Sequence, residues 1–327
     1  MKLLGVELAR LRARRAVQIL LLLGLASTLL FAWAAYSSAQ PMSAASREMA
    51  EEQWRLAQED WEEYGQEQVE QCREDEAAEA ERTGQDVDWG CEDMEPQREW
   101  FFWEPPAFAD YLPSAVVPGL LVIALVSLMV GVTFVAAEFA TGAIGTWLTF
   151  EPRRGRVFAS KTVAAAAAAV LFGLVWGALF IGANAAGYAA AGSDVAVTGT
   201  LAHLVLRAAA LTAAITVVGT GLAFVLRHTA ASLGVAIGYL IGVDTILLGN
   251  VVPGGQRWQL TLNLTAWLSG RPAPYYEESC TVDATGTFCD YVERTVSMTQ
   301  GGLVLLAVTV AVTAVAFVTF RTRDIAG

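Results

Sequence analysis

Lysine and histidine are almost absent from this chain of 327 residues, which contains only Lys2, Lys161, His203 and His228. The P-loop of an ATP-binding protein needs a lysine in a GxxxxGK[ST] loop, where it reaches the phosphates. Neither lysine follows such a loop, so we do not expect ATP to bind to this chain in that way. The histidines lie apart from the four cysteines, and no two cysteines are closely spaced, which argues against a zinc site.

Charged residues are also scarce, at 17% of the chain against 55% hydrophobic residues, which is outside the range of ordinary soluble proteins. The charges gather in a few segments, and the apolar runs between them reach the roughly 20 residues that cross a bilayer. The predicted spans are residues 16–36, 115–137, 162–187, 201–226, 230–249 and 302–320. No nucleophile–base pair or metal-ligating group lies within them, so we predict no catalytic or metal site and no nucleic-acid partner.

The first span has the alternative interpretation of a cleaved signal peptide, because basic residues precede it and small residues follow it. Its apolar run is longer than the roughly 7–15 residues of a signal-peptide core. We therefore expect the span to be retained.

Basic residues near the span ends predict the orientation. They are Lys2, Arg10, Arg12, Arg14, Arg15, Arg153, Arg154, Arg156, Lys161, Arg227, Arg321 and Arg323. With six spans these residues all fall on one side, which the positive-inside rule assigns to the cytoplasm. We therefore predict a multi-pass protein of the plasma membrane whose termini, residues 1–15 and 321–327, are both cytoplasmic.

The opposite side then carries two large loops, residues 37–113 and 251–301. The first has 22 Asp and Glu against five Arg. A helix is predicted from Met42 to about Arg82, because apolar side chains recur there at three- and four-residue steps. These side chains are Trp54, Ala57, Trp61, Tyr64 and Cys72. The simplest interpretation of this excess of acidic residues is a solvated surface. The alternative is that the loop binds a basic external partner or a cationic cargo. The second loop contains PGG and a turn-rich stretch from Arg271 to Thr287.

All four cysteines fall in these two loops, as an oxidising exterior permits. We favour the disulfides Cys72–Cys91 and Cys280–Cys289, although four cysteines allow three connectivities. Free thiols are the alternative.

The segment between the second and third spans, residues 138–161, reads EFATGAIGTWLTFEPRRGRVFASK. An acid at the membrane edge and a turn at Gly142 precede a short amphipathic stretch, and a basic cluster follows. The apolar members of that stretch are Ile144, Trp147, Leu148 and Phe150. Such a stretch can lie against the membrane and dock another protein. The alternative is a positively charged loop that serves topology alone.

This segment resembles the corresponding region of permease subunits of the type-2 export family of ABC transporters, especially the high-GC bacterial members. Those commonly read E-[FY]-x-x-G-T-I-R, then P-R-R-x-R-V and a lysine before the third span. The matching residues are Glu138, Phe139, Gly142, Ile144, Pro152, Arg153, Arg154, Arg156, Val157 and Lys161. Ala143 and Gly145 depart from the usual Thr and Arg. The tail FRTRDIAG and the opening VELARLRARRA are also similar to those of the family.

The resemblance implies a coupling helix from Thr141 to Phe150 that docks on a separate ABC ATP-binding subunit. ATP and Mg²⁺ would be bound by that subunit, and a second permease copy or a paralogue would complete a dimer. Glu138 would lie at the membrane end of the coupling helix and pair with Arg153, Arg154 or Arg156. By analogy at the level of the fold, the cargo is an amphipathic or lipophilic compound or peptide.

Two ionisable residues, Arg207 and Asp244, lie within the predicted fourth and fifth spans. Charges inside a membrane are costly and are usually paired. Because the two residues lie at similar depths on consecutive spans, an intramembrane ion pair is predicted. The alternative is that Arg207 extends toward the surface and that Asp244 hydrogen-bonds backbone or water.

We therefore predict an all-α membrane protein with six transmembrane helices, an N-terminal amphipathic helix, a cytoplasmic coupling helix and a large acidic extracellular helical loop. The expected function is the permease subunit of an ATP-driven exporter, which is a transport subunit and not itself an enzyme. The alternative is a non-transporting receptor or immunity protein whose acidic domain binds a ligand. An ion-driven carrier is disfavoured, because the spans contain few ionisable residues.

Overall fold

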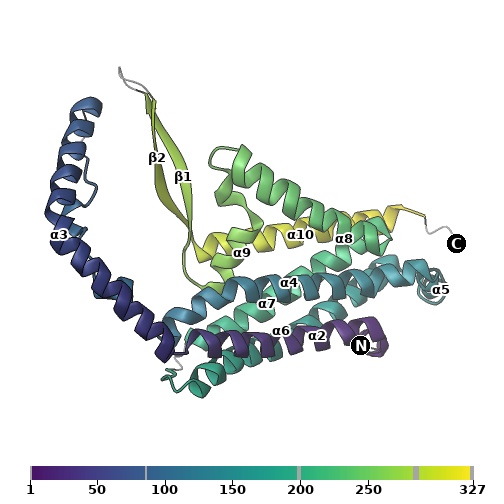
Figure 1. The fold of residues 1–327 in the computed structure, drawn as a ribbon. Coiled ribbons are helices and arrows are strands. Elements are labelled where there is room, and N and C mark those ends of the chain that lie inside the picture. Colours follow the sequence, from purple (N-terminus) through teal and green to yellow (C-terminus); the bar gives the residue numbers. More distant parts are fainter. Residues whose placement is uncertain (1, 85–86, 197–199, 283–286, 325–327) are drawn as a thin grey trace. The chain divides into compact units, whose positions relative to one another are not determined.

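The computed structural model describes residues 2–84, 87–196, 200–282 and 287–324. Within them, six helices are long and apolar enough to cross a membrane. Their bounds are α2 (Arg15–Ser38), α4 (Phe108–Ala140), α6 (Arg154–Ala190), α7 (Thr200–Leu226), α8 with the π-helical η3 (Thr229–Gly238 and Tyr239–Val251) and α10 (Met298–Thr322) (Figure 1). The predicted all-α membrane class is confirmed.

The chain folds as two units. The first comprises residues 1–37, 107–279 and 289–327 and contains the membrane helices. The second comprises residues 38–106 and 280–288 and contains the long acidic helix α3 (Ala44–Thr83).

Helix α7 lies at the centre of the first unit and packs against α4, α6 and α10. Glycine allows the closest of these approaches. A Cβ on Gly219 would lie 2.6 Å from the carbonyl oxygen of Leu128, and one on Gly131 would collide with the carbonyl of Thr216. Small residues at such contacts are the usual means of packing membrane helices, because lipid supplies no hydrophobic drive for helix association.

Helix α2 joins the same bundle through its contacts with α6. The indole of Trp176 donates to the Gly24 carbonyl over 3.1 Å, and the rings of Phe31 and Phe180 meet edge to face at 4.9 Å. The short helix α1 (Lys2–Ala13) precedes α2 and packs on α6. In Figure 1 the start of α1, the short helix α5 (Ala143–Phe150) and the end of α10 lie at one end of the bundle.

The stretch predicted as a turn-rich loop from Arg271 to Thr287 is instead part of a β-hairpin. Its strands are β1 (Ala273–Val282) and β2 (Thr287–Val296). The segments APYYEESCTV and TFCDYVERTV are rich in aromatic and β-branched residues, which favour strands. The short helices η4 (Gly255–Trp258) and α9 (Leu260–Ser269) precede the hairpin.

In the second unit, α3 has the extent that its periodicity predicts. Ser43 caps its start, because its hydroxyl accepts from the Ser46 amide over 3.1 Å. Gly84, at φ 67°, ends it. Trp54 and Trp61 are half-buried, but Tyr64, predicted on the same face, is exposed.

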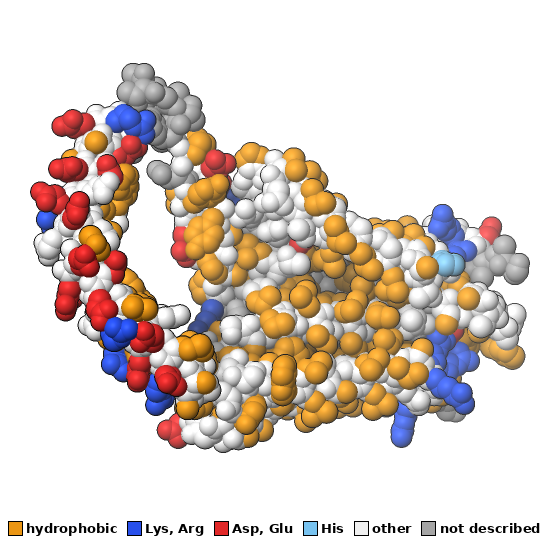
Figure 2. All heavy atoms as spheres, viewed as in Figure 1, with side chains coloured by type: hydrophobic (Ala, Val, Ile, Leu, Met, Phe, Trp, Pro, Cys, Tyr) orange, Lys and Arg blue, Asp and Glu red, His pale blue; other side chains and the backbone are white. Residues whose placement is uncertain are grey.

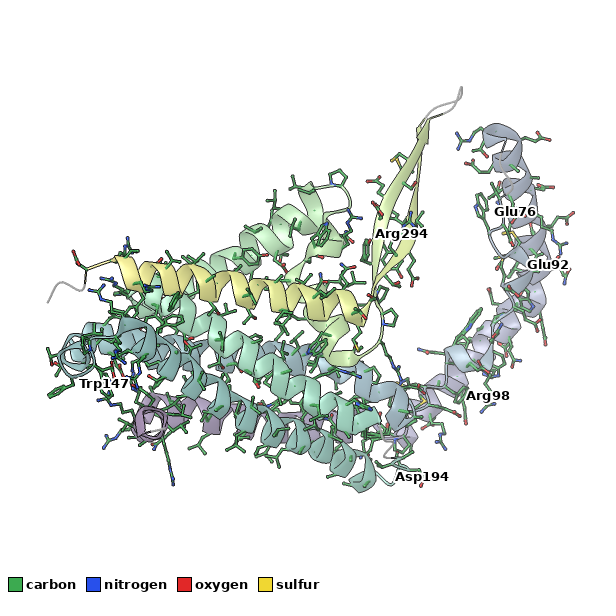
Figure 3. The ribbon with its side chains drawn as sticks, turned by 180° about the vertical axis from the view of Figure 1, so that it is seen from behind. Glu76, Glu92, Arg98, Trp147, Asp194 and Arg294 are labelled. Carbon is green, nitrogen blue, oxygen red and sulfur yellow. A yellow bond between two sulfur atoms is a disulfide. The ribbon has the colours of Figure 1, made fainter. Side chains whose placement is uncertain are left out.

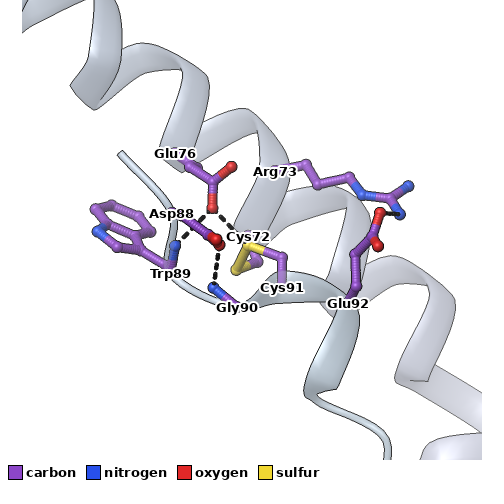
Figure 4. The surroundings of a disulfide bond; sticks show 8 residues. All are labelled: Cys72, Arg73, Glu76, Asp88, Trp89, Gly90, Cys91 and Glu92. Carbon is purple, nitrogen blue, oxygen red and sulfur yellow. Dashed lines mark hydrogen bonds and ion pairs between the residues drawn. A yellow bond between two sulfur atoms is a disulfide. The ribbon is translucent and has the colours of Figure 1, made fainter. Parts of the chain in front are cut away.

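The chain after α3 folds back along it through η1 (Cys91–Asp93) and η2 (Arg98–Trp100). The predicted Cys72–Cys91 disulfide is present (Figure 4). Glu76 accepts the Trp89 amide over 2.8 Å beside it, and Phe101 packs edge to face on Trp54 at 5.5 Å. The disulfide and these contacts together hold the segment against the helix.

Cys280 and Cys289 are also disulfide-bonded, which leaves them only each other as partners. The predicted connectivity is therefore the one that the structure has, and the free-thiol alternative is wrong. Glu278 lies near these two sulfurs, but sulfurs joined in a disulfide are not the thiolates that bind zinc.

Candidate functional site

Helix α5 is a short element between the two longest helices of the bundle. The predicted segment 138–161 is divided among three helices, because α4 continues to Ala140, α5 spans Ala143–Phe150 and α6 begins at Arg154. Gly142 makes the turn into α5 at φ 71°, a conformation that favours glycine. This turn ends α4 and begins α5.

The side chains of α5 divide between two environments. Ile144 is buried, and the Trp147 ring lies under the guanidinium of Arg10 from α1, at 4.2 Å. Leu148 is half-buried. Phe150, in contrast, is 81% exposed, a larger fraction than for the other large hydrophobic side chains described. Figure 3 shows Trp147 at the end of the bundle. The helix is thus anchored on one side and presents a phenylalanine on the other.

Directly behind α5 lies a buried ion network made of Glu7, Arg14, Glu138 and Lys161. Lys161 is 0% exposed, and its Nζ lies 2.8 Å from Glu7 Oε2 and 2.5 Å from Glu138 Oε2. Arg14 Nη2 donates to Glu138 Oε1 over 2.7 Å, and Arg14 Nη1 donates to the Thr133 carbonyl over 2.9 Å. The contact of Glu138 Oε2 with Lys161 is an ion contact without hydrogen-bond alignment. Two buried carboxylates therefore face a buried lysine and an arginine that is 23% exposed.

The network joins three elements that are distant in sequence. Glu7 belongs to α1, Glu138 to the last turns of α4 and Lys161 to the second turn of α6. Buried charges are stable only when they are well paired. A displacement of α5, which connects α4 to α6, must therefore move these charges together or separate them at a large cost.

The predicted pairing of Glu138 with Arg153, Arg154 or Arg156 is wrong. Glu138 contacts Arg14 and Lys161, whereas none of the three arginines at the start of α6 contacts it. Arg154 donates to the Arg323 carbonyl at the end of α10 over 2.7 Å, and Arg156 pairs with Glu151 at 3.0 Å. The sequence interpretation missed Glu7 and Arg14. One available signal was that Glu7 is the only acid among the basic residues before the first span.

The predicted Arg207–Asp244 ion pair is not formed either. Asp244 accepts hydrogen bonds from the amide and hydroxyl of Thr261 over 3.2 and 2.7 Å, and from the amide of Leu260. Arg207 Nη1 donates to the Leu268 carbonyl over 3.4 Å. The two charges therefore hold opposite ends of α9, the carboxylate at its N-terminus and the guanidinium at its C-terminus. Each sign is the one that the helix dipole favours.

Removing the carboxylate that holds the start of α9 should destabilise the fold. We expect Asp244→Ala to lower the free energy of unfolding by about 1–3 kcal/mol, because it leaves buried amide donors without an acceptor. Thr261→Val, which removes only the hydroxyl donor, should cost less. Unfolding of the purified protein in detergent, followed by tryptophan fluorescence, measures both. If the double swap Arg207→Asp/Asp244→Arg proved more stable than either single variant, the two residues would be a pair after all.

The arrangement of these elements agrees with the comparison with known proteins. The model of a family described as ABC-2 family transporter protein matches residues 7–325. The chain belongs to the ABC-2 transporter family. A search of curated protein sequences finds no significant match.

Membership of the ABC-2 family makes this chain a multi-pass membrane transport subunit. ABC-2 permeases usually work with a separate ATP-binding subunit and generally have no ATPase site of their own. The match spans both the buried ion network and α5. It favours transport over the alternative of a non-transporting receptor.

Proposed function

We propose that this chain is the permease subunit of an ATP-driven exporter. ATP and Mg²⁺ bind to a separate subunit, which docks on α5. The exposed Phe150, presented by a helix whose other side is anchored in the bundle, is the observation that carries this proposal. Aromatic side chains at the centre of a contact supply a large part of the binding energy of protein interfaces.

The buried ion network is the route by which docking acts on the membrane helices. Closure of two ATP-binding subunits displaces α5, and α5 is continuous with the ends of α4 and α6. Lys161 and Glu138 tie those two ends to each other, and Lys161 and Glu7 tie α6 to α1. We infer that the four helices tilt as one body and open a path for cargo.

The charge pattern supports a cytoplasmic location for this end of the bundle. Lys and Arg side chains gather where α5 lies (Figure 2), and basic residues remain on the cytoplasmic side of membrane proteins. Disulfides form in oxidising surroundings, so the second unit with its Cys72–Cys91 bond belongs outside the cell. In this arrangement both termini are cytoplasmic and the protein lies in the plasma membrane.

The cargo path runs between two permease chains, the second being another copy or a paralogue. The resemblance to type-2 exporters supports this assembly and an amphipathic or lipophilic compound or peptide as cargo. The few charges inside the spans fit such a cargo better than an ion.

Purification of the tagged chain from its native membranes in mild detergent tests the proposal. We expect a P-loop protein to copurify in a fixed ratio, and the complex to hydrolyse ATP until Mg²⁺ is removed with EDTA. The chain expressed alone is the control and should hydrolyse none. A homogeneous preparation of the chain that transports cargo without any P-loop subunit would disprove an ATP-driven mechanism.

A further inference from the structure

A second group of charges at the same end of the bundle is not used by α5 or the buried ion network. It comprises six arginines from the start of α6, the junction of α7 with α8 and the end of α10: Arg153, Arg154, Arg156, Arg227, Arg321 and Arg323. We call it the arginine cluster. Arg323 donates to the Val225 carbonyl over 3.2 Å and Arg227 donates to the Asp324 carbonyl over 2.9 Å. Like the bond from Arg154 to Arg323, these bonds use backbone carbonyls, which carry no full negative charge.

Among the described residues, the arginine cluster has more positive charge than negative charge close to it. Among the described residues, only Arg156 of the six has a carboxylate within salt-bridge distance, that of Glu151. The guanidinium of Arg153 has no hydrogen-bond or ion-pair partner in the part of the chain that the structure describes. Like charges so close together repel one another unless an anion lies between them.

Arg227 shows the effect of this crowding. Its Nε and Nη2 atoms are buried and have no hydrogen-bond partner. Burial, with the nearby charges of Arg323 and Arg154, lowers the pKa of its guanidinium. Its backbone adopts φ 56°, which is uncommon for a residue with a side chain. The guanidinium is half-buried and lies over the Phe139 ring at 5.4 Å, so an anion that approaches the cluster would stabilise it further.

A hollow of about 470 Å³ gives an anion access to the cluster. Arg153, Arg154, Arg156 and Arg321 line it, together with the ring of Phe317. Phe317 lies one turn before Arg321 on α10, so the hollow is basic on one side and apolar on the other. Farther along the same face of α10, Leu303, Leu306 and Val310 are exposed at helical spacing. An apolar stripe on a membrane helix thus leads to a pocket of arginines at the helix end.

We propose that this hollow binds the phosphate of an anionic phospholipid, with an acyl chain along the exposed face of α10. The phosphate supplies negative charge to the arginine cluster. The planar guanidinium of an arginine can also donate two parallel hydrogen bonds to phosphate oxygens. A lipid fits better than a soluble anion, because the hollow lies at the end of membrane helices and has the Phe317 ring in its wall. Basic pockets at that level of a membrane protein characteristically hold lipid head groups.

Native mass spectrometry of the purified full-length protein, titrated with phosphatidylglycerol, tests the proposal. Phosphatidylcholine has the same chains without the net charge, and inorganic phosphate has the charge without the chains. We expect phosphatidylglycerol to bind at least about tenfold more tightly than phosphatidylcholine, because each basic residue near an anionic lipid contributes roughly fivefold. If inorganic phosphate bound as tightly as phosphatidylglycerol, the hollow would be a site for a free anion, and the lipid assignment would be overturned.

The variants target Arg153 and Arg321, whose guanidinium groups make no hydrogen bond in the described structure, although that of Arg321 lies over the Phe317 ring at 5.4 Å. Arg153→Gln/Arg321→Gln should weaken phosphatidylglycerol binding about twentyfold to thirtyfold, since two such contributions are lost. The matched control is Arg12→Gln/Arg15→Gln, which removes the same charge from exposed positions at the same end. It should change binding less than about threefold, because its arginines lie outside the hollow.

An equal loss in both double variants would mean general attraction to the surface and would overturn the proposal. Unchanged lipid binding in Arg153→Gln/Arg321→Gln would also overturn it. If the same variant no longer bound the ATP-binding subunit, the hollow would be a site for an acidic segment of that protein. If the double variant does not fold, Arg153→Gln alone should weaken binding about fivefold.

Discussion

Replacing Lys161 with methionine should lower the free energy of unfolding by about 3–5 kcal/mol, the usual cost of breaking a buried ion pair. The substitution preserves the length of the side chain but removes the charge that Glu7 and Glu138 share at 2.8 and 2.5 Å. Glu138 retains Arg14, but Glu7 retains only Arg10, which lies 3.9 Å away and whose side chain is 41% exposed. Two carboxylates with almost no solvent contact then face each other with too little positive charge. Unfolding of the protein in detergent, followed by tryptophan fluorescence, gives the magnitude.

An exposed ion pair on the same stretch of chain provides the matched control. Arg156 and Glu151 lie 3.0 Å apart, with the arginine in solvent. Arg156→Gln should therefore cost under about 1 kcal/mol. The triple variant Glu7→Gln/Glu138→Gln/Lys161→Met should recover much of the loss, because it leaves no uncompensated carboxylate at the site. If Lys161→Met is no more harmful than Arg156→Gln, the network does not hold α1, α4 and α6 together.

Features that depend on neighbouring residues in the sequence were predictable. The apolar runs predicted all six membrane helices, because a span needs only length and composition. The extent of α3 followed from its apolar spacing, and the structure adds the caps Ser43 and Gly84 at its ends. The disulfide Cys72–Cys91 was favoured because both cysteines fall in one loop.

The partners of charged residues were not predictable, because they depend on how distant helices meet. Similar depth on consecutive spans made Arg207 and Asp244 a reasonable pair. No sequence pattern indicates that α9 folds between the two residues, with Asp244 at its first turn and Arg207 at its last. Glu138 was assigned to the nearest arginines in sequence, whereas its actual partners come from α6 and from Arg14 between α1 and α2. The β-hairpin was missed for another reason: its aromatic and β-branched residues lie between glycines and prolines that indicated turns.

These corrections change the expected role of each residue in the coupling segment. Trp147 and Ile144 face the bundle, so substituting them disturbs the attachment of α5 to its own protein. Glu138 belongs to the buried ion network, and Arg154 ties α6 to the end of α10. Phe150 is the most exposed of the large apolar side chains of α5, and Leu148 is half-buried.

Phe150→Glu should therefore strongly weaken docking of the ATP-binding subunit while the permease remains folded. An aromatic anchor at the centre of an interface commonly contributes 2 kcal/mol or more, so we expect association to weaken by at least about thirtyfold. The side chain is 81% exposed and makes few contacts within the permease, so the unfolding midpoint should not change. Tyr291→Glu is the matched control. The Tyr291 ring is 72% exposed, and it lies on the part of β2 that belongs to the first unit, away from α5. Titration of the purified ATP-binding subunit against each variant, with ATP hydrolysis measured in the same samples, compares the two. Wild-type affinity in Phe150→Glu, or an equal loss of affinity in Tyr291→Glu, would contradict docking on α5. The ATP-binding subunit would then bind another part of the permease.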